Sequence, residues 1–546
     1  MGNFKDKVVY QIYPRSFMDT NNDGIGDLKG IISKLDYLKE LGIDYIWLNP
    51  IFPSPQADNG YDVSDYCAID PTFGTMEDLE ALIDEASKRN IYLMFDMVFN
   101  HSSTEHKWFK EALKGNEKYK KYYFFKKGKD GKLPTNWCSK FGGPAWKYVP
   151  EFDEYYLHLY DEKQADMDWT NEEVRNEFIQ ILNFWIKKGI RGFRFDVINN
   201  IDKQKFEDCP QGVGKQFYCD QPRVHQYLNE LNTKTFGNVE NCITVGEMSS
   251  TSVENCIGYT NPDNHELDMV FSFHHLKVDY VNKEKWTSMP FDFKELKQLM
   301  NDWQVEMQKG NGWNALFWNC HDQPRSLSRF GDDKNYPKES AKMLATTLHM
   351  MRGTPYIYQG EEIGMTNHYF DCIEKYRDVE SINAYNILKE KGKDEAYILK
   401  VLQEKSRDNA RTPMQWDDSE NAGFTHGKPW ISVIDNYKDI NVKNALNDTN
   451  SVFYHYKKLI SLRKEYAIIQ EGNYVPLFEA DDAIFASKRV LNNEELLVLS
   501  NFYGKECTFD MDLSDYEILL SNYADSLNTN HTLRPYESLV LYKKSK

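Results

Sequence analysis

Residues 192–200 read GFRFDVINN, an apolar run that carries Arg194 and ends at Asp196. A run this apolar is typical of a parallel strand that is buried on both faces of a sheet. Seven further runs of this kind begin at Val8, Tyr45, Tyr92, Cys242, Met269, Asn314 and Pro355. Amphipathic helical patterns separate the runs. Strand and helix that alternate eight times predict an α/β fold, a (β/α)8 barrel of the TIM type.

Two long insertions and a tail interrupt this alternation. Residues 102–170 are too long for one connecting helix and predict an insertion domain over the active site. A second insertion follows the eighth run, roughly at residues 364–450. Beyond residue 470, short alternating strands predict an antiparallel β domain. We therefore expect the catalytic barrel in residues 1–101 and 171–470, and a C-terminal β-sandwich domain in residues 471–546.

The composition excludes several classes of function. The chain of 546 residues has 66 Lys and Arg against 84 Asp and Glu, a net charge of −18, which argues against nucleic acid and anionic membranes as partners. No apolar run reaches the ~20 residues of a membrane helix, and the first residues lack the features of a signal peptide. Nine scattered cysteines, an odd number, favour free thiols in a reducing compartment. We expect a cytoplasmic protein, with a monomer as the default oligomeric state.

Several of the predicted strands end in a carboxylate, namely those that carry Asp96, Asp196, Glu247 and Asp322. The C-terminal ends of barrel strands converge where the active sites of such barrels lie. Any single one of these carboxylates could cap a helix or pair with an arginine, but four in apolar contexts indicate a functional site. Glycosidic cleavage uses two carboxylates, one as nucleophile and one as general acid. Arg194 shares a strand face with Asp196 and would keep that nucleophile ionised.

The blocks DMVFNH, GFRFDVINN, TVGEM and NCHDQPR occur in this order, accompanied by QADMDW and GTPYIYQGEEIGM. With these blocks the chain resembles the α-amylase superfamily, glycoside hydrolase family 13, over nearly its whole length. The resemblance implies that Asp196 is the nucleophile and Glu247 the general acid/base. It implies that Asp322 orients the sugar and supports the transition state, while His101 and His321 hydrogen-bond hydroxyls of the same sugar.

Two further blocks resemble the glucosidase branch of the family. DNGYDVSDY supplies Asp58, which would cap the non-reducing end of the glucose, and Tyr61, which would stack on its face. SRDNARTPMQW supplies Arg407 and Arg411, one of which should pair with Asp58 and close the pocket. The sequence does not decide which, although Arg407 is favoured, and a surface i,i+4 arrangement is the alternative. Together with Arg194 these residues form the predicted substrate-binding set.

A polar loop near the N-terminus predicts a structural metal site. Its pattern D-x-N-x-D-G-x-x-D matches the first part of an EF-hand loop. Gly30 stands where an EF-hand has its final Glu, so this is not a full EF-hand. The resemblance implies a structural Ca²⁺ or Mg²⁺ here, with the Ile25 carbonyl as one ligand, and no organic cofactor. A polar turn with Asx hydrogen bonds is the alternative. The expected ligands are Asp19, Asn21, Asp23, Ile25 and Asp27.

The region after the sixth run bears on the substrate. FSFHHLKVDYVNKEKWT, from Phe271, resembles the phospho-α-(1,1)-glucosidase branch. Lys277 and Lys285 could hold the phosphate of the leaving sugar, and two solvated lysines are the alternative. In this branch a Val next to the nucleophile, here Val197, accompanies linkages other than α-1,4, so the resemblance implies such a linkage. The expected function is retaining hydrolysis of trehalose 6-phosphate, a phosphorylated disaccharide, to glucose and glucose 6-phosphate. The alternative is an oligo-1,6-glucosidase acting on isomaltose and isomalto-oligosaccharides.

Overall fold

A parallel sheet of eight strands is the centre of the fold in this computed structural model, which describes residues 4–525 and 531–544. The strands follow the order β11-β10-β9-β3-β2-β1-β13-β12. The two ends of this order, β11 and β12, are consecutive in the chain, which is the strand order of a (β/α)8 barrel. The predicted fold class and its eight strands are therefore confirmed. Their bounds are β1 (Val9–Ile12), β2 (Tyr45–Leu48), β3 (Tyr92–Met97), β9 (Gly192–Phe195), β10 (Ile243–Glu247), β11 (Met269–Phe271), β12 (Ala315–Leu316) and β13 (Thr354–Tyr358).

The chain clusters into two compact units. The first contains Trp47–Asp84 and Tyr92–Phe273, and the second contains the described residues of 4–46, 85–91, 274–525 and 531–544. In the first unit, Arg194 of β9 pairs in parallel register with Asp96 of β3 and with Val245 of β10. In the second unit, β13 pairs in parallel with β1 and with β12.

Helices in the connecting segments cover the strands. In α6, for example, Asn171 caps the first turn and Gly189, at φ 106°, ends the helix. Its buried face includes Phe178, whose ring centroid lies 4.1 Å from that of Phe99, two residues after β3. The bounds are α1 (Leu28–Ser33), α2 (Leu35–Leu41), α3 (Met76–Ser87), α6 (Glu172–Lys188), α7 (Arg223–Lys234), α8 (Val253–Thr260), α9 (Phe293–Lys309), α10 (Ser326–Phe330), α11 (Pro337–His349), α15 (Val452–Glu465) and α16 (Ala467–Glu471).

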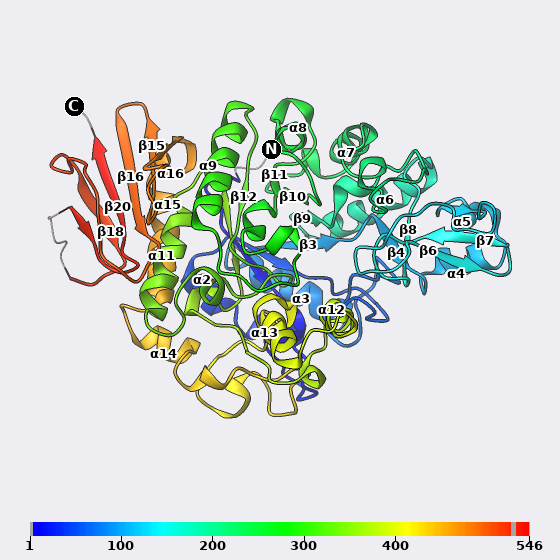
Figure 1. Ribbon diagram of the computed structural model, residues 1–546, viewed down its shortest axis with the longest axis horizontal. Helices are drawn as coiled ribbons and strands as arrows, with labels where there is room; N and C mark the ends of the chain where they lie inside the picture. The colour runs from blue at the N-terminus through cyan, green and yellow to red at the C-terminus, as the bar shows by residue number, and fades with distance from the viewer. Residues whose placement is uncertain (1–3, 526–530, 545–546) are drawn as a thin grey trace. The chain divides into compact units, whose positions relative to one another are not determined.

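The segment after β3 folds around an aromatic core to which Tyr218, from the segment after β9, also contributes. Figure 1 shows it in cyan, with a small sheet beside two short helices. Its core contains Trp137, Trp146 and Tyr218. Antiparallel pairing of β4 with β8 places His101 opposite Asp166. The elements are β4 (His101–Ser103), α4 (Lys107–Leu113), α5 (Glu117–Lys120), β5 (Phe125–Lys126), β6 (Trp146–Val149), β7 (Glu154–Leu157) and β8 (Gln164–Asp166).

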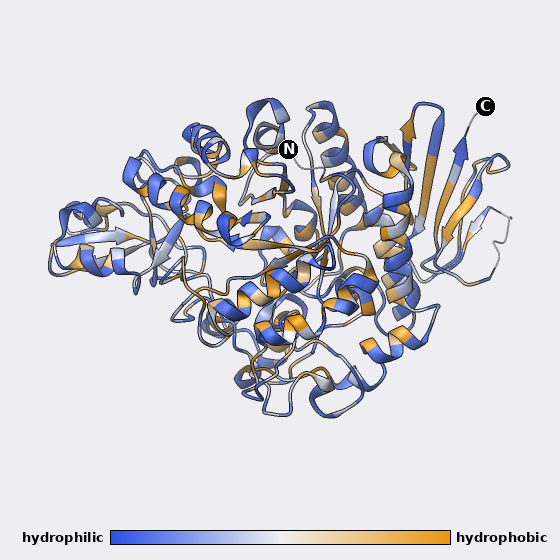
Figure 2. Cartoon of the chain, turned by 180° about the vertical axis from the view of Figure 1, so that it is seen from behind, coloured by the Kyte–Doolittle hydropathy of each residue, from blue (hydrophilic) through white to orange (hydrophobic). Residues whose placement is uncertain are grey.

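Two further parts belong to the second unit. The segment after β13 contains α12 (Val379–Glu390), α13 (Glu395–Lys405) and α14 (Val442–Asn447). The tail forms a five-stranded antiparallel sheet beside α11 and α16, and a separate two-stranded sheet (Figure 1). Figure 2 shows apolar stretches along these strands, and Leu497, Leu499 and Leu541 are part of their core. The domain boundaries stay predictions. The strands are β14 (Asn473–Leu477), β15 (Ile484–Leu491), β16 (Glu494–Asn501), β20 (Ser538–Lys544) and β18 (Glu517–Ser521), with β17 (Cys507–Thr508) and β19 (Thr532–Leu533) in the small sheet.

Two predictions about the whole chain can be compared with the structure. Within residues 4–525 and 531–544, no helix combines the length and the apolar character needed to cross a bilayer. All nine cysteines lie in these ranges, and all are free thiols, as the sequence predicted.

Candidate active site

One buried guanidinium gathers three carboxylates in the first unit. Arg194 Nη1 donates to Asp96 Oδ1 at 2.7 Å and to Asp196 Oδ1 at 2.6 Å. Its Nη2 donates to Glu247 Oε2. Arg194 is 2% exposed, so solvent screens these charges little. The predicted nucleophile and the predicted general acid therefore bind the same cation. Asp196 directly follows β9, and Glu247 is the last residue of β10.

The charge balance of this group suits proton transfer. One guanidinium cannot neutralise three carboxylates, so repulsion among the carboxylates favours a proton on one of them. A group that holds one exchangeable proton can supply the acid in one step and the base in the next. Arg194 meanwhile holds the Asp196 carboxylate in place by an ion pair of 2.6 Å.

Asp96 anchors this arrangement, although the sequence assigned it no role beyond its position at a strand end. Its Oδ2 accepts from Tyr61 Oη at 2.8 Å and from Trp47 Nε1 at 3.1 Å. Burial raises the pKa of Asp96 to about 6, with Arg194 acting in the opposite direction. Asp96 therefore holds both Arg194 and the ring of Tyr61, which was predicted to stack on the sugar.

Gln164 brings three of the predicted sugar-binding residues together. Its Nε2 lies 3.1 Å from Asp58 Oδ2, from the Tyr61 carbonyl oxygen and from His101 Nε2. Burial lowers the pKa of His101, which favours the neutral imidazole. The sequence missed Gln164, whose only signal was its place in the accessory block QADMDW.

The residue after the nucleophile has an unusual backbone conformation. Val197 adopts φ 38° and ψ 40°, in the left-handed region. A β-branched residue rarely occupies this region, and such strain is found most often at functional sites. The turn out of β9 is therefore held by its surroundings, with the Asp196 amide donating to the Met97 carbonyl at 3.0 Å.

In the second unit, both predicted arginines converge on the third predicted carboxylate. Arg411 Nη2 donates to Asp322 Oδ1 at 2.8 Å, and Arg407 Nη1 donates to the same oxygen at 3.1 Å. Arg411 Nε also donates to the His321 carbonyl at 2.9 Å. The His321 ring is placed by a contact of 2.9 Å between its Nδ1 and Gln11 Nε2. Asp322 and His321 are thus fixed by side chains from distant parts of the chain.

Asp378 is a second carboxylate partner of these arginines. Its Oδ1 accepts from Arg407 Nη2 at 2.5 Å, and Arg411 Nη1 lies 3.7 Å away. Its Oδ2 accepts from the Ser381 amide and so caps α12. Burial alone would raise the pKa of Asp378, but Arg407 and Arg411 hold it well below its usual range. Sequence reasoning missed this residue, and the predicted pairing of Asp58 with one of the arginines stays a prediction.

The two lysines predicted to bind phosphate have different surroundings. Lys285 Nζ lies 2.6 Å from Glu380 Oε2 and 4.8 Å from the centre of the Trp286 ring. Its side chain is 22% exposed, so Lys285 is not a solvated lysine. Lys277 is exposed and ends a short 3-10 helix, His274–Lys277.

The N-terminal polar loop is closed by its own hydrogen bonds. Asp19 Oδ1 accepts from the amides of Asn21 and Asn22, Asp23 Oδ1 accepts from the Ile25 amide, and Asp27 caps α1. Within the described ranges, no three His, Cys, Asp or Glu side chains gather closely enough to hold a metal ion. Carboxylate, amide and carbonyl oxygens are nevertheless the donors that Ca²⁺ and Mg²⁺ prefer. The metal site stays a prediction.

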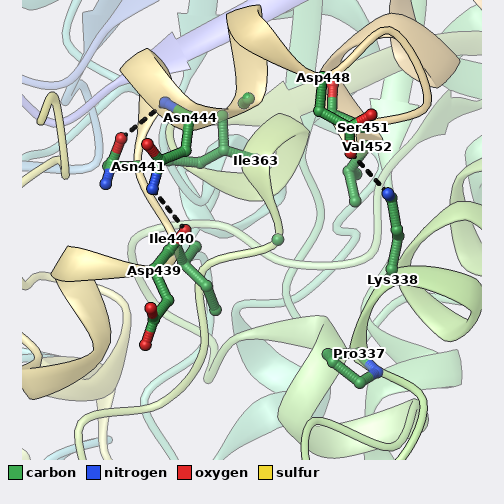
Figure 3. Close-up of a pocket in the computed structure, with 12 residues that line it drawn as sticks. Pro337, Lys338, Ile363, Asp439, Ile440, Asn441, Asn444, Asp448, Ser451 and Val452 are labelled. Atoms are coloured by element: carbon green, nitrogen blue, oxygen red, sulfur yellow. Dashed lines mark hydrogen bonds and ion pairs between the residues drawn. The ribbon is translucent and has the colours of Figure 1, made fainter.

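A cavity of about 310 Å³ lies in the second unit and contains none of the predicted site residues (Figure 3). Its polar side chains already serve the fold. Asn441 and Ser451 cap α14 and α15, and Lys338 pairs with Asp448 at 2.6 Å. This cavity is therefore not a candidate for the active site.

Comparisons with known proteins identify the family to which the chain belongs. The alpha-amylase catalytic domain family matches residues 11–472. The chain is 56% identical to a trehalose-6-phosphate hydrolase of Bacillus subtilis (98% of this chain, 97% of that protein) and 50% identical to an oligo-1,6-glucosidase of Bacillus cereus (99% of both). It is also similar to a crystal structure of Bacillus licheniformis trehalose-6-phosphate hydrolase, with a TM-score of 0.96, 56% identity and 100% of both chains covered.

Proposed function

The chain belongs to the α-amylase family of glycoside hydrolases, and from that premise we propose that it hydrolyses trehalose 6-phosphate to glucose and glucose 6-phosphate. The observation that carries the chemistry is the pair of carboxylates Asp196 and Glu247 on one buried guanidinium, that of Arg194. The relatives support the substrate, because a trehalose-6-phosphate hydrolase is 56% identical over nearly the whole chain.

The reaction proceeds by double displacement with retention of configuration. Asp196 attacks the anomeric carbon of the glucose while Glu247 gives its proton to the departing oxygen. Glu247 then takes a proton from the water that attacks the same carbon, and Asp196 is released. Asp322 would hold hydroxyls of the sugar and support the positive charge of the transition state. Arg194 stays bound to both carboxylates and fixes their directions.

The phosphate of the leaving sugar would be bound by Lys277 and Lys285. A chain with a net charge of −18 repels an anionic substrate at long range, so local cations must supply the attraction. Charge-assisted hydrogen bonds from ammonium groups are strong enough for this purpose. The Glu380 partner of Lys285 shows that this cation is held in a defined position before any substrate arrives.

A second candidate is an oligo-1,6-glucosidase, which Val197 and the 50% identical relative also fit. The two functions share every catalytic group, so only the substrate separates them. The test is steady-state kinetics of the same preparation on trehalose 6-phosphate and on isomaltose. A higher kcat/KM for isomaltose would replace the first proposal by the second.

Two further properties belong to this proposal. The loop from Asp19 to Asp27 would hold a structural Ca²⁺ or Mg²⁺ through Asp19, Asn21, Asp23, the Ile25 carbonyl and Asp27. The enzyme would act in the cytoplasm, because nine free thiols suit a reducing compartment and phosphorylated sugars are held inside cells by their charge.

A further inference from the structure

The carboxylate of Glu380 lies between the lysine expected to bind phosphate and an arginine that binds Asp322. Glu380 Oε2 is 2.6 Å from Lys285 Nζ and 3.5 Å from Arg407 Nε. Arg407 Nη1 in turn lies 3.1 Å from Asp322 Oδ1. Glu380 therefore has two cations within reach of one oxygen, and a small rotation of its side chain would change its partner.

Each cation of this cluster is paired with a carboxylate before substrate binds. The cations are Lys285, Arg407 and Arg411, and the anions are Glu380, Asp378 and Asp322. A phosphate dianion beside Lys285 would meet the Glu380 carboxylate at the same ammonium group. The two side chains are 22% and 19% exposed, so solvent screens this repulsion only in part. While Glu380 is paired with Lys285, its charge therefore weakens the binding of phosphate to this lysine.

We propose that Glu380 is a specificity-determining residue that occupies Lys285 in the free enzyme and yields it to the phosphate of a bound sugar by turning to Arg407. This inference rests on the proposed function. The phosphate of bound trehalose 6-phosphate has the binding energy of both glucose rings to displace Glu380. Inorganic phosphate lacks this energy, and the product glucose 6-phosphate has lost the energy of the other glucose. Glu380 therefore weakens the binding of inorganic phosphate and of glucose 6-phosphate. This repulsion selects for the intact substrate.

The experiment is inhibition of p-nitrophenyl α-glucoside hydrolysis by glucose 6-phosphate. Glu380→Gln should lower the inhibition constant of glucose 6-phosphate by about tenfold or more, because it removes the competing charge. Inhibition by glucose, which has no phosphate, should be the same in both proteins. Glu390→Gln makes the same charge change at an exposed position of α12 and should leave both constants unchanged. The difference should shrink with added salt.

A second substitution tests whether Glu380 acts through Lys285. Adding Lys285→Met to Glu380→Gln should abolish the gain in affinity for glucose 6-phosphate. If Glu380→Gln does not fold, Glu380→Asp, which draws the carboxylate back by one methylene, should change the constant in the same direction. An unchanged or raised inhibition constant in Glu380→Gln, or a gain that survives the loss of Lys285, would overturn the inference. A wild-type enzyme that does not cleave trehalose 6-phosphate would instead overturn the proposed function.

Discussion

Lys203 Nζ lies 2.9 Å from Asp166 Oδ1, and neither side chain is accessible to solvent. The ammonium group also donates to Asn100 Oδ1 at 2.8 Å, and Asn100 Nδ2 donates to the same Asp166 oxygen at 3.1 Å. Asn100 precedes His101, a predicted sugar-binding residue, in the chain. One buried ion pair therefore connects the segment after β9 to the segment that carries His101.

Removing one partner of this pair should be costly. Lys203→Met leaves Asp166 as an uncompensated buried charge, and we expect a loss of ~3–5 kcal/mol in the free energy of unfolding. Denaturant titration measures it, with Lys205→Met as an exposed control on the same segment. Adding Asp166→Asn should recover part of the loss. A cost for Lys203→Met equal to that of the control would show that the pair does not stabilise the fold.

Glu247→Gln should remove general acid catalysis. The amide cannot donate a proton to the departing oxygen, so kcat/KM on trehalose 6-phosphate should fall by at least ~10²-fold. A p-nitrophenyl glucoside has a good leaving group and should lose less in the first step. Burst kinetics on the aryl substrate and steady-state rates on the natural one measure the two effects. Equal losses of activity on the two substrates, in a folded variant, would contradict the role of Glu247 as general acid.

Replacing Lys277 and Lys285, the two lysines proposed to bind phosphate, should affect the hydrolysis of phosphorylated substrates only. Each charge-assisted hydrogen bond contributes ~1.5–3 kcal/mol, so Lys277→Ala/Lys285→Ala should lower kcat/KM for trehalose 6-phosphate by at least ~10²-fold. The loss should lie mainly in KM, because the phosphate is remote from the bond that breaks. Hydrolysis of p-nitrophenyl glucoside provides the comparison. If kcat/KM falls equally for both substrates, these lysines support the fold and do not bind phosphate.

Chelation should test the loop from Asp19 to Asp27. If it holds a divalent ion, exhaustive chelation should lower the thermal midpoint, and added Ca²⁺ or Mg²⁺ should restore it by mass action. Differential scanning fluorimetry with elemental analysis measures both quantities. Asp23→Asn weakens a proposed ligand at an exposed position and should reduce the response to metal. No metal in the protein and an unchanged midpoint would leave a polar turn with Asx hydrogen bonds.

Stability should depend on pH through Glu361. Burial raises the pKa of Glu361 to about 8, although the hydrogen bond from Tyr456 Oη, 2.7 Å from Glu361 Oε1, acts in the opposite direction. The folded state therefore binds this proton more tightly than the unfolded state. Its contribution to stability is complete below about pH 4.5 and is lost as the pH rises to about 8.

Glu361→Gln keeps an acceptor for Tyr456 and removes the charge. Between about pH 5 and pH 8, the thermal midpoint of the wild type should therefore fall more than that of the variant. Glu390→Gln, at an exposed position, should follow the wild type. Parallel curves for all three proteins would mean that Glu361 does not control this dependence.

Much of the site could be predicted because its signals are local in the sequence. Asp196 and Glu247 stand at the ends of apolar strands, and parallel strands carry such ends to one edge of the sheet. Arg194 could be assigned from strand alternation alone, since it lies two residues from Asp196. In the structure Arg194 contacts Asp196, and it also contacts Glu247, which strand alternation does not predict.

Other residues near the predicted site could not be predicted, because no local pattern in the sequence marks them. Gln164 contacts Asp58 across 106 residues of sequence, and Glu380 contacts Lys285 across 95. Asp378 matches the pattern of a helix cap, which it is, so nothing in the sequence reveals that it also binds Arg407. These contacts join segments far apart in the sequence, and no periodicity relates them.

The sequence by itself determined the eight-stranded fold and indicated the two carboxylates of the proposed mechanism, because hydrophobic periodicity and strand ends are properties of neighbouring residues. Only the tertiary structure decided the partner of each charge: Asp378 for Arg407, Glu380 for Lys285 and Asp166 for Lys203. The physical reason is that an ion pair forms between the groups that folding brings together and removes from water. Their separation along the chain has no influence on that choice.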